Sequence, residues 1–173
     1  MPQITIEFLL ESKIGVSVEA IGAKVIEKAV RRRMAVRELT DPDAYLRQLQ
    51  TSEQEWNELV EMVVIPETWF FRNRQSFTFL EEYIKTEWLP QQQDKVLRGL
   101  SIPCSTGEEP YSIAITLLEA GLRPEQIHID AVDISAKALQ KAKQGTYGEE
   151  SFRNKETLDL RARYFENKKK TYH

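Results

Sequence analysis

The 173-residue sequence contains a single cysteine, Cys104, and therefore no internal disulfide framework. A lone cysteine is typical of the reducing cytoplasm, so we expect a cytoplasmic protein. No apolar run approaches the roughly 18 residues of a membrane span, and the first residues lack the basic start and apolar stretch of a secretory signal. The net charge of −3 gives no general attraction to nucleic acid. These absences disfavour membrane insertion, secretion and nucleic-acid binding.

The first 65 or so residues have the hydrophobic period of helices and no strand alternation. Ser17 is placed to cap a helix. Ser52 and Glu55 have the spacing of a capping box at the start of another helix, which Pro66 ends because proline cannot continue the hydrogen-bond ladder. The apolar positions that form one stripe on the first of these helices are Val18, Ile21, Val25 and Ala29. This pattern predicts a small all-helical domain.

The period changes further along the chain, where two short β-rich runs alternate with helical segments. Ser135 is placed to cap one of these helices and Gly145 to end it. Strand, helix, strand, helix in this order predicts parallel strands, as in the first part of an α/β sheet. The expected elements are a helix over 76–90, a strand over 96–104, a helix over 111–120, a strand over 127–133, and helices over 136–143 and 155–163.

The loop after the first predicted strand is acidic and contains one glycine, Gly107, followed by Glu108 and Glu109. Ligands of open α/β sheets bind at the carboxyl ends of the strands. A dinucleotide site would place several glycines there for a diphosphate, which two carboxylates would repel. S-adenosylmethionine carries a sulfonium and an ammonium group and no phosphate, so it fits this loop better. The alternative is that both glutamates only stabilise the first turn of the next helix.

Asp133 ends the second predicted strand, about two dozen residues beyond the glycine. An acid at this place can accept hydrogen bonds from both hydroxyls of a ribose. The alternative is a cap for the following helix, for which Ser135 is better placed. Together, the acidic loop and Asp133 favour an adenosine ligand that carries a positive group.

Three adjacent aromatic residues over 69–71, followed by Arg72, fit neither a helical stripe nor a strand. This segment is either the wall of a pocket, with Arg72 as an anion contact, or an aromatic hinge that packs two domains together.

These runs resemble successive motifs of the CheR-type protein-glutamate methyltransferases of chemoreceptors, and the resemblance covers nearly the whole chain. The Ser-Thr-Gly-Glu-Glu-Pro-Tyr run at 105–111 is the most specific of them. The family combines an all-helical amino-terminal domain with a Rossmann-like methyltransferase domain. The resemblance therefore implies a helical domain over 1–66, a joining segment over 67–95, and the first part of a methyltransferase domain over 96–173, which stops before that fold is complete.

The resemblance also implies roles for single residues. Thr68 and Arg72 match positions of the cofactor pocket, and Arg72 lies near the transferred methyl group. Glu108 or Glu109 would hold the amino end of S-adenosylmethionine, with Glu108 favoured, and Asp133 would bind the ribose. The family often has asparagine where this chain has Pro66. The expected product is S-adenosylhomocysteine, and no metal site is predicted.

The implied partner is a cytoplasmic chemoreceptor helix that carries the accepting glutamate. A basic flank on one predicted helix would complement such glutamate-rich helices; the alternative is an ordinary solvated face. It consists of Lys24, Lys28, Arg31 and Arg32. A second hypothesis for the whole chain is a non-catalytic receptor-binding or regulatory module. An incomplete sheet would expose a strand edge, so self-association is also expected.

Overall fold

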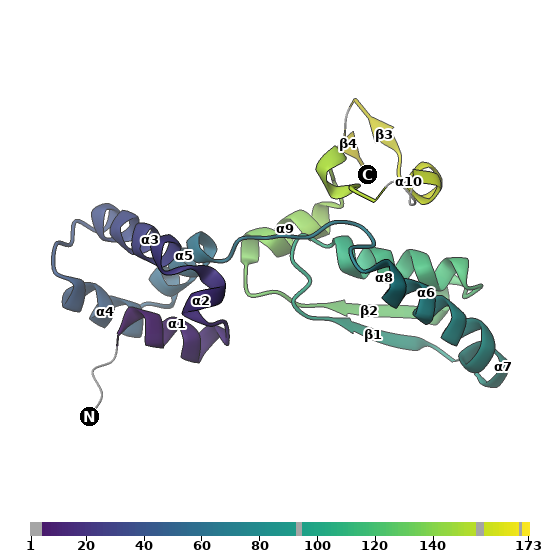
Figure 1. Ribbon diagram of the computed structural model, residues 1–173, viewed down its shortest axis with the longest axis horizontal. Helices are drawn as coiled ribbons and strands as arrows, with labels where there is room; N and C mark the ends of the chain where they lie inside the picture. The colour runs from purple at the N-terminus through teal and green to yellow at the C-terminus, as the bar shows by residue number, and fades with distance from the viewer. Residues whose placement is uncertain (1–4, 93–94, 155–157, 170) are drawn as a thin grey trace. The chain divides into compact units, whose positions relative to one another are not determined.

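The computed structural model describes residues 5–92, 95–154, 158–169 and 171–173, which form two compact units (Figure 1). The first unit ends at Ile65 and the second begins at Pro66. Residues 67–95, expected as a joining segment, lie within the second unit. In the part of the chain that the structure describes, no helix combines the length and hydrophobicity of a transmembrane span.

The first unit is all helical, with short helices packed around one hydrophobic core. Its elements are α1 (Ile6–Ile14), α2 (Val18–Ile21), α3 (Ala23–Val36), α4 (Pro42–Thr51) and α5 (Glu53–Val63). Four of these helices have an N-cap side chain that accepts a hydrogen bond from a backbone N–H group. The N-cap residues are Thr5, Ser17, Asp41 and Ser52. The side chains least exposed in the core are Leu10, Ile26, Tyr45, Leu49, Leu59 and Val60.

The single helix that the apolar stripe predicts is in fact two helices. Gly22 lies between α2 and α3 with φ of 91°, a conformation that glycine adopts without a steric penalty. The stripe nevertheless faces the core, because Val18 and Ile21 pack against the same cluster as the buried Ala29. The spacing predicted part of the buried face, but it missed the break and did not include Ile26, the least exposed residue of α3.

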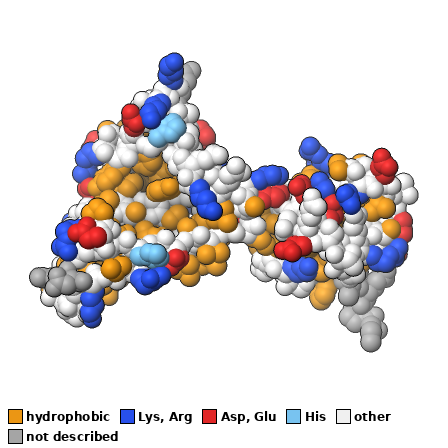
Figure 2. Space-filling model, turned by 180° about the vertical axis from the view of Figure 1, so that it is seen from behind, with side chains coloured by type: hydrophobic (Ala, Val, Ile, Leu, Met, Phe, Trp, Pro, Cys, Tyr) orange, Lys and Arg blue, Asp and Glu red, His pale blue; other side chains and the backbone are white. Residues whose placement is uncertain are grey.

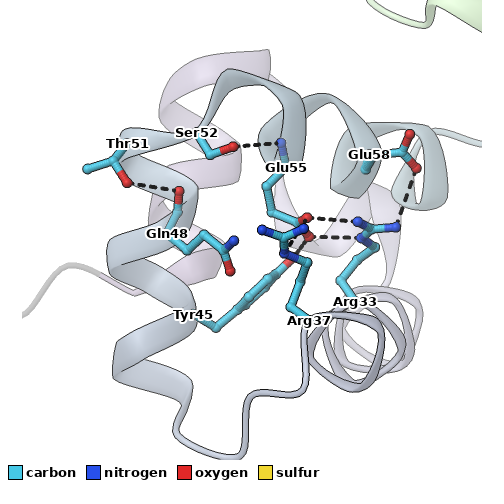
Figure 3. Close-up of polar contacts among 8 residues, drawn as sticks. All are labelled: Arg33, Arg37, Tyr45, Gln48, Thr51, Ser52, Glu55 and Glu58. Carbon is cyan, nitrogen blue, oxygen red and sulfur yellow. Dashed lines mark hydrogen bonds and ion pairs between the residues drawn. The ribbon is translucent and has the colours of Figure 1, made fainter.

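Glu55 is the centre of a buried polar network that joins α3, α4 and α5 (Figure 3). Its two carboxylate oxygens accept from Arg33 Nε at 2.8 Å and Arg33 Nη2 at 2.7 Å. The Tyr45 hydroxyl donates to the same carboxylate at 3.0 Å. The Ser52 hydroxyl caps α5 as the capping box predicts, by accepting from Glu55 N, while the Glu55 side chain points into this network. The pKa of Glu55 is lowered, chiefly by its bonds to Arg33.

The second unit is mixed α/β, and the predicted order of strand, helix, strand and helix is confirmed. Its helices are α6 (Arg74–Tyr83), η1 (Ile84–Trp88), α7 (Leu89–Gln91), α8 (Glu108–Glu119), η2 (Pro124–Gln126), α9 (Ala136–Gln144), η3 (Glu149–Ser151) and α10 (Leu158–Tyr164). Its strands are β1 (Leu97–Ser101), β2 (Ile127–Ala131), β3 (Asn167–Lys168) and β4 (Thr171–Tyr172). The first residues of the helix predicted over 155–163 lie outside the described residues. The described part of this helix is α10, which begins at Leu158.

Strands β1 and β2 are parallel, with Gly99 opposite Ile129. One face of the sheet packs against α8 and the helices before β1, through Leu97, Ile127 and Ile129. Residues on the other face, such as Leu100, are exposed. Figure 2 shows hydrophobic side chains gathered on the face of this unit that is turned to the viewer. Within the described residues, β1 pairs only with β2, so its other edge has no partner.

A second core, separate from the packing of the sheet, is largely aromatic. Phe70 stacks on Phe152 with ring centroids 4.8 Å apart and meets Tyr147 edge to face at 4.9 Å. The hairpin of β3 and β4 adds Tyr172 to this cluster. The cluster therefore joins segments that are far apart in the chain, from Phe70 to Tyr172.

Candidate functional site at the strand tips

The loop between β1 and α8 turns on Gly107, which has φ of 100°. A Cβ atom at this position would lie 2.7 Å from the Tyr147 hydroxyl and 2.8 Å from the Ala142 Cβ. These distances are shorter than any normal contact, so both the conformation and the space require glycine here. The Tyr147 hydroxyl also donates to Thr106 O at 2.9 Å. A buried tyrosine, 41 residues along the chain from Thr106, therefore packs against this loop and stabilises it through a hydrogen bond.

Asp133 lies just beyond β2 and binds the loop that follows β1. Its carboxylate accepts from Ser105 N at 2.7 Å and from Ser135 N at 2.9 Å. The two strand tips are further joined by the bond from Cys104 N to Val132 O at 2.8 Å. Ser135 itself caps α9 and accepts from Ala138 N, as predicted. Asp133 therefore stands where the two strands end, which is the expected ligand end of an α/β sheet.

The strand tips are electrostatically negative around Cys104. Burial raises the pKa of the Cys104 thiol, and the nearby carboxylates of Asp133 and Glu109 raise it further. A thiol in these surroundings stays protonated at neutral pH and is a poor nucleophile. Such a site suits a cationic ligand better than an anionic one.

The two adjacent glutamates at the start of α8 have different surroundings. Glu108 is only 2% exposed, and its carboxylate accepts from the hydroxyls of Thr106 at 2.6 Å and Ser151 at 2.9 Å. Glu109 is exposed and accepts from the hydroxyl of Ser101, at the end of β1, at 2.7 Å. Both residues therefore have partners in the fold, beyond the general preference for acids at a helix start.

The aromatic segment belongs to the second unit, where Phe70 and Phe71 are buried in the core. Thr68 is partly exposed and Arg72 is exposed. The Arg72 guanidinium lies over the Trp69 ring, 4.7 Å from its centroid, and donates to Glu67 O at 2.6 Å. None of the described contacts joins the Arg72 side chain to the loop after β1.

The structure thus brings four of the predicted site residues to the strand tips, namely Gly107, Glu108, Glu109 and Asp133. Two residues that the sequence did not indicate, Ser112 and Ser151, lie beneath them and are buried. Ser112 is a polar residue among the apolar positions of α8, and this was the only available signal. The basic set predicted to bind the receptor is on α3, in the first unit, with all four side chains exposed.

This combination of a two-stranded parallel sheet, an acidic tip loop and an acid after the second strand fits an S-adenosylmethionine-binding α/β unit. Comparison with known families agrees. Residues 66–173 match the family described as "CheR methyltransferase, SAM binding domain", and residues 8–64 match "CheR methyltransferase, all-alpha domain". The chain belongs to the CheR methyltransferase family, whose methyl donor is S-adenosylmethionine.

Several curated relatives match most of this chain. The chain is 48% identical over 160 residues to a protein of Pseudomonas aeruginosa named "Probable biofilm formation methyltransferase WspC", covering 92% of this chain and 37% of the relative. It is 32% identical to "Chemotaxis protein methyltransferase 2" of Vibrio cholerae, covering 82% of this chain and 51% of the relative. It is 30% identical to "Chemotaxis protein methyltransferase" of Escherichia coli, covering 91% and 54%. The chain therefore spans about a third to a half of the length of these relatives.

Proposed function

We propose that this protein takes part in the S-adenosylmethionine-dependent methylation of glutamate side chains on chemoreceptors. The observation that carries the proposal is the acidic arrangement at the strand tips, where Asp133 and the Glu108–Glu109 pair flank a loop with one glycine. S-adenosylmethionine supplies an activated methyl group on a positive sulfur. Its positive groups suit these carboxylates, and it lacks the diphosphate that they would repel.

Asp133 is the residue we assign to the ribose. Each of its oxygens accepts one backbone N–H group, from Ser105 or from Ser135, and an ionised carboxylate can accept about four hydrogen bonds. Lone pairs therefore remain for two hydroxyl groups. The backbone bonds fix the orientation of the carboxylate before any ligand binds, which reduces the entropy cost of binding.

The amino end of the cofactor is assigned to the two glutamates. Glu108 remains the favoured residue, and its carboxylate is held in place by the hydroxyls of Thr106 and Ser151. Glu109 is the alternative, because it is the exposed member of the pair. Titration of single Glu108→Gln and Glu109→Gln variants with S-adenosylmethionine distinguishes the two residues. The variant of the residue that contacts the amino group should show the larger loss of affinity.

Arg72 is the residue we assign to positioning the acceptor, and Thr68 to the cofactor pocket. A glutamate acceptor has an ordinary pKa of about 4.3 and is already ionised at neutral pH, so this chain needs no general base. The Arg72 guanidinium is exposed and, within the described structure, donates one hydrogen bond, to Glu67 O, out of five possible donations. It can therefore form a paired hydrogen bond with an incoming carboxylate.

The test is transfer of a radiolabelled methyl group to receptor membranes by the protein at its natural length. Arg72→Ala should lower the transfer rate about 10- to 100-fold while the affinity for S-adenosylmethionine changes much less, since the loss is one of alignment. Arg153→Ala is a matched control, because Arg153 also lies over the Trp69 ring, at 5.0 Å. Unchanged turnover in Arg72→Ala would remove the proposed role.

The receptor itself is proposed to bind the basic set on α3. Lys24, Lys28, Arg31 and Arg32 are exposed along one helix, and acidic receptor helices would complement them. Arg31 is already paired with Glu27 at 2.5 Å, so the other three carry most of the available charge. Because one of the relatives is named for biofilm formation, we propose that the receptor belongs either to chemotaxis or to biofilm signalling.

The second candidate is a non-catalytic receptor-binding or regulatory module. The observation that favours it is the exposed basic set on α3, because binding of a receptor helix by this set requires no methyl transfer. Binding of S-adenosylmethionine without methyl transfer by the protein at its natural length would support this candidate.

A further inference from the structure

Two buried serines connect the aromatic segment to Glu108. Ser112, on α8, is 0% exposed. Its hydroxyl accepts from Phe71 N at 3.0 Å and donates to Glu108 O at 2.6 Å. A hydroxyl has both a donor and acceptor lone pairs, so one small side chain can make both bonds. Ser112 thereby joins the backbone of Phe71 to the backbone of Glu108, 37 residues apart by their numbers in the sequence.

Ser151, at the end of η3, makes a second connection of the same kind. Its backbone C=O accepts from Phe70 N at 2.8 Å, and its hydroxyl donates to Glu108 Oε1 at 2.9 Å. The other carboxylate oxygen of Glu108 accepts from Thr106 at 2.6 Å. The side chain of Glu108 is therefore linked to Phe70, while its backbone is linked to Phe71.

The residue that Ser112 holds has an unfavourable backbone conformation. Phe71 has φ of 56°, in the left-handed region, and is 2% exposed. A bulky non-glycine residue keeps such a conformation only when its surroundings fix it. Among the bonds that fix it here is the one from Phe71 N to Ser112 Oγ. Arg72 follows Phe71 directly, so the course of the backbone into Arg72 depends on this contact.

We propose that Ser112 and Ser151 are positioning residues that fix Arg72 and the Glu108 carboxylate relative to each other. Both serines are buried, so they act through the segments that they hold and not by touching a ligand. The proposal rests on the proposed function for the roles of Arg72 and Glu108. The bonds themselves are independent of that function and can be tested separately.

The first test measures hydrogen exchange of single backbone amides by NMR in the 173-residue chain. Ser112→Ala removes the acceptor of the Phe71 amide and should speed its exchange at least tenfold, with a shift of its resonance, while the Phe77 amide changes little. Thr116→Val is the matched control. Thr116 is also buried on α8, and its hydroxyl donates to the backbone oxygen of Ser112, four residues earlier. Within the described structure this hydroxyl makes no hydrogen bond to the aromatic segment.

The second test measures the affinity for S-adenosylmethionine by calorimetry. Ser151→Ala keeps the backbone acceptor of Phe70 and removes only the bond to the Glu108 carboxylate, so it should weaken affinity at least fivefold with little change at Phe71. Ser112→Ala should weaken affinity as well, and Thr116→Val should stay within twofold of the unchanged chain.

Three outcomes decide the matter. If the Phe71 amide exchanges no faster in Ser112→Ala than in Thr116→Val, the proposal is overturned. It is also overturned if exchange rises but both serine variants bind S-adenosylmethionine as well as Thr116→Val does. If the unchanged protein at its natural length does not bind S-adenosylmethionine, the proposed function fails, and the exchange data alone decide whether the serines hold the segment.

Discussion

Replacing Glu55 should destabilise the helical unit far more than replacing any nearby exposed acid. The side chain of Glu55 is 4% exposed, and the side chain of Arg33, its partner through two hydrogen bonds, is 13% exposed. Glu55→Ala leaves the Tyr45 hydroxyl without its carboxylate and, among the described residues, leaves Arg33 only the longer contact with Glu58, at 3.4 Å. Removing one member of a buried ion pair costs about 3–5 kcal/mol. That is a large part of the roughly 5–15 kcal/mol that stabilises a typical protein.

Urea unfolding, followed through NMR signals of α3, α4 and α5, measures this loss in the unit concerned. With a slope of about 1 kcal/mol per molar for so small a unit, the midpoint should fall by about 3 M or more. Glu58→Ala is the control. Glu58 also pairs with Arg33, but at 3.4 Å and with 45% of its side chain exposed, so its loss should cost less than about 1 kcal/mol. Equal shifts for the two variants would refute the reasoning.

The same ion pair predicts how stability changes with pH. The hydrogen bonds from Arg33 hold the pKa of Glu55 below its ordinary value of 4.5 in the folded state. A carboxyl group with a lowered folded pKa adds stability that is present above the unfolded pKa and is lost as the pH falls through the folded one. The difference in stability between the unchanged chain and Glu55→Gln should therefore shrink below about pH 4.5. A difference that stays constant down to pH 2 would contradict this.

Three further predictions concern other parts of the molecule. Gly107→Ala should cost the second unit about 2 kcal/mol or more by calorimetry, because its Cβ would meet Tyr147 at 2.7 Å, whereas Gly99→Ala, with 3.7 Å to its nearest neighbour, should cost much less. Reversing the charges of Arg31 and Arg32 should slow association with receptor helices at low salt, and an effect that does not depend on salt would count against the proposed surface. The unpaired edge of β1 in the described structure should cause self-association, and light scattering that shows a strict monomer would refute it.

Local signals were sufficient to predict several of the helix caps and the parallel strands. Ser17 and Ser135 cap their helices and Gly145 ends α9 in the left-handed conformation, since such caps depend on a few adjacent residues. The break at Gly22 was missed because the apolar stripe continues across it. The hairpin of β3 and β4 was missed because two-residue strands show no alternation.

The candidate site was predictable as a set of residues, but its internal contacts were not. The position of Asp133 after a strand indicates a ligand end without any knowledge of the partners. The different surroundings of Glu108 and Glu109 depend on Ser151, which lies 43 residues from Glu108 and has no local signal. Likewise, Glu55 has the spacing of a capping box, yet its side chain pairs with Arg33, 22 residues away. Contacts of this kind follow from the folded packing and not from the spacing of residues.

Titration of the chain with S-adenosylmethionine in a calorimeter is the measurement closest to the claim that the acidic strand tips bind a positively charged nucleoside. The expected result is binding of one molecule per chain, weakened about tenfold or more by Asp133→Asn, because hydrogen bonds to a charged group contribute about 1.5–3 kcal/mol. Asp130→Asn, on the exposed face of β2 and paired with Arg98, should leave the affinity unchanged. Absence of binding, or equal losses in the two variants, would contradict the claim.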